Sequence, residues 1–342
     1  MKKVTRISKR KADHLRINLE KDVNSGIDTG LDHFHFIHEA IPEINLTDVK
    51  LDLELFGKYL SSPLIISSMT GGTPQAEFFN VQFALAAQEC KIAMGVGSQR
   101  AALETPALSR TFDIRKYAPD ILLFANLGAI QLNNGMNLVH CQRAIDMIQA
   151  DGLILHLNPL QEALQTDGES NFGSLAEKIE IICKKLSLPV IVKEVGWGIS
   201  ENAARILYNC GVSAIDVAGA GGTSWSQVEM YDAESEYYQD LAAAFKAWGI
   251  PTAKSIMNVK KIAPDLPIIA SGGIINGVDM AKCVALGATL SGSAGIFLRA
   301  ASISLEKIVD QIHLLQDQLK ITMFATGSRK LSELHKKILT VD

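Results

Sequence analysis

The densest group of reactive side chains follows directly after an apolar run. Residues 152–155 (Gly-Leu-Ile-Leu) have the continuous hydrophobic pattern of a buried strand, and His156, Asn158, Gln161 and Glu162 come next. A carboxylate beside amides suits Mg²⁺ and a diphosphate, because Mg²⁺ takes one or two carboxylates and adds phosphate oxygens. Two alternatives stay open at this point. Glu162 could be a first-turn helix residue favoured by the helix dipole, and His156 could be a core histidine.

A lysine, Lys193, ends another apolar run. An unpaired cation in apolar surroundings is costly, so this side chain needs a negative partner. A reduced flavin is anionic at one edge of its ring and would be such a partner, and Ser98 and Asn126 could hydrogen-bond the same ring. Strand alternation places Glu194 on the opposite face, where it would serve packing. An ion pair between Lys193 and Asp216 is the alternative.

Glycine-rich turns follow the last two apolar runs. Gly272 and Gly273 end one of them, and Gly292-Ser293-Ala294 ends the other. Backbone N–H groups exposed beside helix N-termini bind phosphate, so the two turns predict a phosphate site. Two ordinary tight turns are the alternative.

The chain begins with a strongly basic segment. Six cations and no acid fall within its first eleven residues: Lys2, Lys3, Arg6, Lys9, Arg10 and Lys11. Such a segment is either a solvated tail or an arm that binds an anion, and composition alone favours the tail.

Apolar runs of this kind recur eight times and must position the polar residues. They are continuous rather than alternating, which is typical of parallel strands covered on both faces. The runs span residues 63–67, 91–96, 121–126, 152–157, 189–193, 214–217, 267–270 and 288–292. Helical patterns lie between them, at 75–90, 138–150, 173–186, 201–210 and 278–286.

This alternation predicts an α/β fold, a TIM (β/α)8 barrel. We expect a single domain over 1–342, with an N-terminal extension (1–60), the barrel (61–300) and C-terminal helices (301–342). A doubly wound sheet is the rival, but no G-x-G-x-x-G turn follows the first strand. The carboxyl ends of barrel strands form the active-site mouth, which explains the polar and glycine residues at every strand end. The long stretch 224–267 predicts a mobile insertion ahead of a helix over 241–248.

Composition places the chain among globular proteins. It has 342 residues, of which 47% are hydrophobic and 20% charged, and its net charge of −4 gives no support to a nucleic-acid partner. No segment approaches the roughly 18 apolar residues of a membrane span, and no apolar segment of a signal peptide follows the basic start. The five cysteines form no CxxC pair, so we expect reduced thiols in a cytoplasmic protein.

The motifs together resemble one known family over nearly the whole chain: type 2 isopentenyl diphosphate isomerases, which are flavin-dependent. The most specific matches are Asn-Pro-Leu-Gln-Glu (158–162) and Gly-Gly-Thr-Ser-Trp (221–225). The other matching segments are Arg10–Leu15, Ser68–Gly72, Gly97–Arg100, His156–Leu157, Lys193-Glu194 with Gly196 and Gly198, Asp216–Ala220 and Ser271–Gly273. The turn at 291–294 matches more loosely.

The resemblance implies a barrel that binds FMN and assembles as a homotetramer or homo-octamer. Such enzymes interconvert isopentenyl diphosphate and dimethylallyl diphosphate by a redox-neutral 1,3-proton shift. They require reduced FMN and Mg²⁺, and NADPH supplies the initial reduction. The basic start then becomes an arm over the diphosphate, because arginine binds phosphate oxygens bidentately.

The resemblance also implies residue roles. Catalytic roles fall on Gln161, His156 and Lys193, and Glu162 would ligate Mg²⁺. Substrate contacts fall on Arg10, Lys11, Ser98, Gln99, Arg100 and Gln161. FMN contacts fall on Ser68, Met69, Thr70, Ser98, Asn126, Lys193 and Thr223, with Gly272, Gly273, Ser293 and Ala294 at its phosphate.

Two other functions remain to be weighed. An FMN oxidoreductase of the α-hydroxy acid oxidase type shares the barrel and the phosphate glycines, but it uses a histidine base late in the barrel. Here Ile275 follows the 271–274 turn, and residues 252–265 contain no histidine. A non-catalytic phosphate-binding barrel would need fewer polar strand ends than this chain has.

Overall fold

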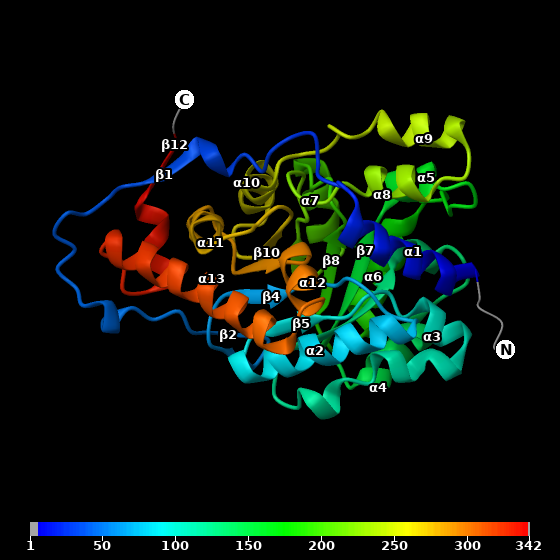
Figure 1. Ribbon diagram of the computed structural model, residues 1–342, viewed down its shortest axis with the longest axis horizontal. Helices are drawn as coiled ribbons and strands as arrows, with labels where there is room; N and C mark the ends of the chain where they lie inside the picture. Colours follow the sequence, from blue (N-terminus) through cyan, green and yellow to red (C-terminus); the bar gives the residue numbers. More distant parts are fainter. Residues whose placement is uncertain (1–5, 341–342) are drawn as a thin grey trace.

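Eight parallel strands close into a barrel in chain order, as predicted (Figure 1). The computed structural model describes residues 6–340. Pairing of the last strand with the first completes the ring, so the fold is a TIM barrel. The strands are β4 (Leu64–Ile66), β5 (Ala93–Gly95), β6 (Leu123–Gly128), β7 (Gly152–Leu157), β8 (Val190–Glu194), β9 (Ala214–Asp216), β10 (Ile268–Ser271) and β11 (Leu290–Ser293).

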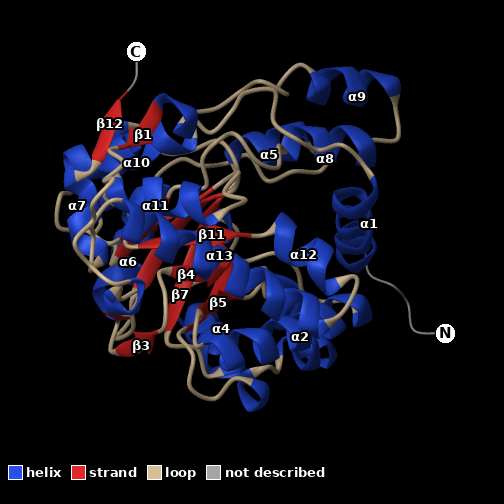
Figure 2. Cartoon of the chain, turned by 60° about the vertical axis from the view of Figure 1, so that its left-hand side comes forward, coloured by secondary structure: helices blue, strands red, loops and turns tan. Residues whose placement is uncertain are grey.

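Helices surround the barrel and cover the outer faces of its strands (Figure 2). Five of them lie where the helical patterns predicted: α2 (Pro74–Cys90), α4 (Leu138–Ile148), α6 (Leu175–Lys185), α7 (Glu201–Asn209) and α11 (Gly277–Ala285). The outer layer also contains α10 (Thr252–Ile262) and α13 (Leu305–Ala325). Shorter helices stand near the strand ends: α3 (Arg100–Glu104), α5 (Pro159–Leu164) and α12 (Gly295–Ala301).

The prediction for the stretch 224–267 is wrong in its helix boundaries. The segment forms α8 (Trp225–Asp232) and α9 (Glu236–Ala243) before α10 begins, and no helix spans 241–248. The chain leaves α9 early because the carbonyl of Lys246 accepts a hydrogen bond from Gly26 N–H at 2.8 Å. Gly249, with φ +127°, then turns the chain away. Figure 1 shows α5, α8 and α9 grouped on one side of the barrel.

The N-terminal extension is ordered over most of its length. Helix α1 (Arg6–Glu20) packs against α8, so the tail interpretation is wrong for this part; Lys2 and Lys3 lie outside the described residues. Strand β1 (Phe34–Phe36) pairs antiparallel with β12 (Ile338–Thr340) near the other end of the chain. A hairpin of β2 (Leu53–Leu55) and β3 (Lys58–Leu60) follows.

The core has two layers. Inside the barrel, Ile65, Phe124, Ile154 and other strand residues form one buried cluster, which the hairpin residues Leu55 and Leu60 extend. Between strands and helices lies a larger cluster. The hairpin closes the amino-terminal end of the barrel, so the carboxyl ends of the strands form its open end.

Two further expectations concern cysteines and membranes. All five cysteines are free thiols, and four of them are buried. Among residues 6–340, no helix combines the length and apolar character that crossing a membrane requires.

Candidate active site

A cavity of about 480 Å³ opens at the carboxyl ends of the barrel strands. This volume lies in the range of small-molecule sites. Residues from all eight strand ends line it, and α1 contributes one further wall. Every site residue predicted from the sequence lines this cavity except Gln99.

Gln99 lies behind the cavity wall rather than in it. Its side chain is fully buried, and its Nε2 donates to the carbonyl of Ala144 at 2.8 Å. Its Oε1 accepts from the N–H of Asn126 at 2.9 Å. Both polar ends are therefore committed to the backbone, and we assign Gln99 to holding the end of β6 instead of to substrate.

Lys193 ends β8 with its ammonium group inside the barrel mouth. Its Nζ lies 3.5 Å from Oδ2 of Asp216, so the ion pair named as the alternative is present. The same nitrogen donates to the carbonyl of Glu194 at 2.8 Å and to Oγ of Ser271 at 3.4 Å. Because Lys193 also lines the cavity, the pair with Asp216 orients the ammonium group without removing it from a ligand's reach.

Glu194 points to the opposite face and supports the loop that follows β8. One carboxylate oxygen accepts from the N–H groups of Val195, Gly196 and Trp197 at 2.6–2.8 Å. Burial raises the pKa of Glu194 to about 7, against the opposing effect of these three bonds. Val195 and Gly196 line the cavity, so this buried carboxylate shapes its wall.

Two features fit a bound FMN. Gly272 and Gly273 have φ of +104° and +75°, and an added Cβ would lie 2.0 and 2.4 Å from the carbonyl oxygens of Gly219 and Gly221. Only backbone can therefore face the cavity there, as a phosphate cradle requires. The buried hydroxyls of Ser67 and Ser68 line the same cavity and have no hydrogen-bond partner within residues 6–340. Unpartnered buried hydroxyls are costly, so a polar ligand is expected beside them.

His156 and Asn126 form a neutral pair on the cavity wall. The imidazole donates from Nδ1 to Oδ1 of Asn126 at 2.8 Å. Burial, together with the charges of Lys193 and Lys11, lowers the pKa of His156 to about 4. His156 is therefore neutral at pH 7 and serves as a wall residue rather than a core histidine.

Three basic side chains bring positive charge to the cavity. Arg10 Nη1 donates to Oε1 of Gln165 at 2.7 Å, and Lys11 Nζ donates to the carbonyl of Ser98 at 2.7 Å. Desolvation, together with repulsion by Arg10, lowers the pKa of Lys11 to about 7. An anion bound here would relieve that repulsion. Arg100 forms ion pairs with Glu104 and with Glu169, which lies in the loop after α5.

The 158–162 segment forms the start of α5. Asn158 Nδ2 donates to Oε1 of Glu162 at 2.8 Å and to Oε1 of Gln161 at 3.2 Å. Glu162 lies in the first turn of α5, as the alternative interpretation predicted, and its side chain also lines the cavity. Each carboxylate oxygen has more than one lone pair, so this geometry fits one ligand of Mg²⁺ alongside phosphate oxygens.

Comparison with known proteins identifies the family. Residues 156–341 match the FMN-dependent dehydrogenase family model. An isopentenyl-diphosphate delta-isomerase of Rickettsia bellii is 47% identical over 98% of both chains. One of Nostoc sp. is 51% identical over 95% of this chain and 93% of its own. The chain belongs to the type 2 isopentenyl-diphosphate delta-isomerase family.

Solved mandelate oxidase structures share the fold of this delta-isomerase family member. One variant superposes with a TM-score of 0.67, covering 99% of this chain and 100% of its own, at 16% identity. A second structure of the same variant has a TM-score of 0.65, covering 96% of this chain and 92% of its own. At this level of identity the likeness shows a shared fold and no more.

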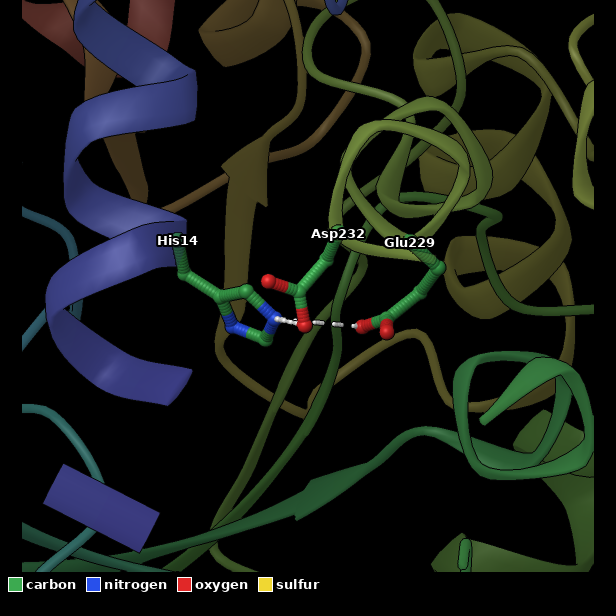
Figure 3. A group of neighbouring side chains, drawn as sticks. All are labelled: His14, Glu229 and Asp232. Carbon is green, nitrogen blue, oxygen red and sulfur yellow. Dashed lines mark ion pairs between the residues drawn. The ribbon is translucent and has the colours of Figure 1, made fainter. Parts of the chain in front are cut away.

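The structure also adds a cluster that the sequence did not assign (Figure 3). Nε2 of His14 lies 3.6 Å from Oε1 of Glu229 and 3.6 Å from Oδ2 of Asp232. Glu229 in turn accepts from Nε2 of Gln161 at 2.8 Å. The cluster thereby connects α1 and α8 of the delta-isomerase fold to a predicted catalytic residue. A helical signal was available, because Arg10, Lys11 and His14 share one face of α1.

Two more charged residues were missed at the mouth. Arg299 of α12 lines the cavity, one turn beyond Gly295. Glu169 forms a bidentate pair with Arg100, at 2.7 and 3.0 Å. Glu169 lies in a loop without periodicity, so only the folded chain reveals its partner.

Proposed function

We propose that the enzyme interconverts isopentenyl diphosphate and dimethylallyl diphosphate by a 1,3-proton shift, with reduced FMN and Mg²⁺ at the barrel mouth. One observation carries the proposal. A single cavity gathers Lys193, a glycine cradle, unpartnered hydroxyls and three basic side chains, in a chain about half identical to named isomerases. Protonation of an unactivated alkene places positive charge on carbon. The site therefore needs a negative group near that carbon and an anchor for the diphosphate.

Reduced FMN, when bound, supplies an anionic ring that stabilises this charge and a nitrogen that can carry the proton. Lys193 supplies a fixed cation for the anionic edge of that ring. Asp216 and the carbonyl of Glu194 hold the ammonium group in place, so no reorganisation is needed when charge develops.

The basic side chains anchor the substrate. Arg10, Lys11 and Arg100 line one cavity and offer N–H donors suited to phosphate oxygens. Glu162 would bind Mg²⁺ between itself and the diphosphate. Binding energy from this remote group orients the reacting carbons, which raises the rate of the chemical step.

Gln161 and His156 position the substrate. An amide is a weak acid, and Gln161 already donates to Glu229, so Gln161 orients rather than protonates. Neutral His156 contributes a hydrogen-bonding wall, and its lowered pKa makes the imidazolium form costly.

A spectrum and an assay test the proposal. The purified protein should absorb in the visible range as a flavoprotein. Removal of FMN should abolish isomerisation, and FMN with NADPH should restore it, with solvent deuterium entering the allylic product in D₂O. Full-rate turnover by flavin-free protein would contradict the proposal. Bleaching of the flavin by substrate would favour the α-hydroxy acid oxidase type instead.

Glu162→Gln tests the metal assignment. The change removes one anionic ligand, so the Mg²⁺ concentration for half-maximal activity should rise about tenfold or more. Exposed Glu177→Gln is the matched control, because it removes the same charge elsewhere. Identical Mg²⁺ titrations for Glu162→Gln and wild type would remove Glu162 from the metal site.

We further propose that NADPH reduces the flavin, and that the enzyme works in the cytoplasm as a homotetramer or homo-octamer. The family resemblance supports these points. Light scattering of the FMN-loaded protein measures the assembly directly, and a monomer would overturn that part.

A further inference from the structure

The loop between α5 and α6, residues 165–174, reaches into the cluster assigned to the diphosphate. Its first residue, Gln165, accepts from Nη1 of Arg10 at 2.7 Å. Four residues later, Glu169 accepts from Nη1 and Nη2 of Arg100 at 2.7 and 3.0 Å. One short segment therefore occupies both arginines that the proposed function assigns to phosphate.

Glu169 makes two further contacts with residues that line the cavity. Its backbone N–H donates to Oε2 of Glu162 at 2.7 Å, and its carboxylate accepts from Nε2 of Gln131. Burial alone would raise the pKa of Glu169, but the bonds from Gln131 and Arg100 lower it below its usual value. The carboxylate of Glu169 is thus anionic and binds Arg100 and Gln131. The backbone N–H of the same residue binds Glu162, the predicted metal ligand.

The loop backbone is fitted to this position. An added Cβ on Gly168 would lie 1.7 Å from the carbonyl oxygen of Glu162, so only glycine allows the loop to lie this close to α5. The N–H of Gly168 donates to the carbonyl of Gln165 at 3.1 Å, which turns the segment back over the helix. Glu169 therefore reaches Arg100 because Gly168 has no side chain.

We propose that Glu169 is a specificity-determining residue that stands in for the diphosphate, and that a ligand must displace it from Arg100 and Glu162 to bind. This inference rests on the proposed function. Its carboxylate takes the place of phosphate oxygens on Arg100, and its N–H takes the place of a cation on Glu162. Displacement frees both residues together, so the diphosphate and its Mg²⁺ gain their ligands in one event.

The same contacts favour diphosphates over monophosphates. A single phosphate group replaces the carboxylate on Arg100 but leaves Arg10 with Gln165. A diphosphate carrying Mg²⁺ offers oxygens to both arginines and a cation to Glu162, so it replaces the contacts that the loop makes with these three residues. Displacing the Glu169 carboxylate therefore costs binding free energy that a diphosphate with Mg²⁺ offsets and a monophosphate does not.

Calorimetric titration of FMN-loaded protein with inorganic diphosphate and Mg²⁺ tests the inference. Glu169→Gln should tighten binding about fivefold, the ratio that corresponds to an ion pair of about 1 kcal/mol. Gly168→Ala should tighten binding as well, because it moves the loop without changing any charge. Glu177→Gln, in the first turn of α6, is the charge-matched control and should bind as wild type does.

Hydrogen exchange gives a second measurement on the wild-type enzyme. Diphosphate with Mg²⁺ should speed exchange in the peptide covering 166–173, because the amide of Glu169 loses its bond to Glu162. Slower exchange there on binding, or unchanged or weaker binding by Glu169→Gln, would overturn the inference and leave Glu169 as a support for Arg100. Failure of wild type to bind diphosphate at all would instead overturn the proposed function, and this inference with it.

Discussion

Three of the basic side chains that line the cavity are held in three different ways. Lys193 faces a buried carboxylate, Arg100 is shared by two carboxylates, and Lys11 donates only to a backbone carbonyl among its described contacts. Burial, with the nearby charge of Arg10, makes Lys11 the one of these three whose pKa falls far below its usual value, to about 7. The protonated form of Lys11 is therefore the one of the three cations that a bound anion stabilises most.

Lys193→Ala should weaken FMN binding. The substitution removes a charged donor, which corresponds to about 1.5–3 kcal/mol, and leaves Asp216 uncompensated. Bound flavin per chain and the flavin dissociation constant measure the effect. Exposed Lys184→Ala should behave as wild type. Full flavin content together with unchanged turnover would remove Lys193 from the site.

Diphosphate binding should depend on the protonation of Lys11. Below pH 7 the free enzyme carries a charged Lys11; above pH 7 the group is neutral and binding must take up a proton. Affinity through this group should therefore fall by up to about tenfold per pH unit above pH 7. Titration of inorganic diphosphate from pH 6 to 9 measures the slope, and Lys11→Met should lack this component. A Lys11→Met profile identical to wild type would contradict the assignment.

Single residues also mark the limit of prediction from sequence. Ser98 and Gln99 follow the same strand, and the pattern placed both at the mouth. Only Ser98 faces the cavity, because the chain begins α3 at Arg100 and turns Gln99 toward α4. Glu169 and Glu229 were missed because each meets its partner across more than 60 residues of chain, a separation that local patterns do not encode.

At the scale of elements, the turns after the strands and helix α1 were harder to predict than the strands themselves. The strands were predictable because continuous apolar runs are required when both faces are covered. Helix α1 was not predictable from composition, since its place depends on contacts with distant segments, such as its packing against α8 and the bond from Lys11 to Ser98. Family resemblance, rather than charge pattern, indicated its role as an arm.

The turn after β10 should tolerate no side chain. Gly272→Ala combines a φ of +104° with a Cβ 2.0 Å from the carbonyl oxygen of Gly219, so we expect a loss of about 3 kcal/mol or more and little bound FMN. Gly211→Ala is the control. Its φ is +77°, but no described atom lies within 4 Å of the added Cβ, so about 1 kcal/mol should be lost. Chemical unfolding and flavin content measure both; equal losses would show that crowding at Gly272 is unimportant.

At the scale of the whole molecule, the two ends of the barrel differ: one is closed by apolar packing and the other carries the candidate active site. The hairpin residues Leu55 and Leu60 close one end with the apolar cluster, and the polar strand ends form the other. The polar end followed from the sequence, because eight runs each pass from apolar to polar in the same direction; the closing hairpin was not predicted. The insertion helices did not follow, because tertiary contacts such as Gly26 to Lys246 set their ends.

Phe124→Ala tests the interior layer. The side chain is fully buried inside the barrel, so truncation should cost about 3–5 kcal/mol in the free energy of unfolding. Phe78 is 55% exposed on α2, and Phe78→Ala should change stability far less. Urea unfolding of the two variants compares them, and equal losses would contradict the layered description of the core.

Pairing between β1 and β12 has a consequence for biosynthesis. The strand that follows α1 finds its partner only at residues 338–340, which are synthesised after all eight barrel strands. A nascent chain can complete the eight-stranded ring at β11 while β1 still lacks that partner. A chain interrupted between α13 and β12 would therefore yield a closed barrel in which β1 lacks this pairing.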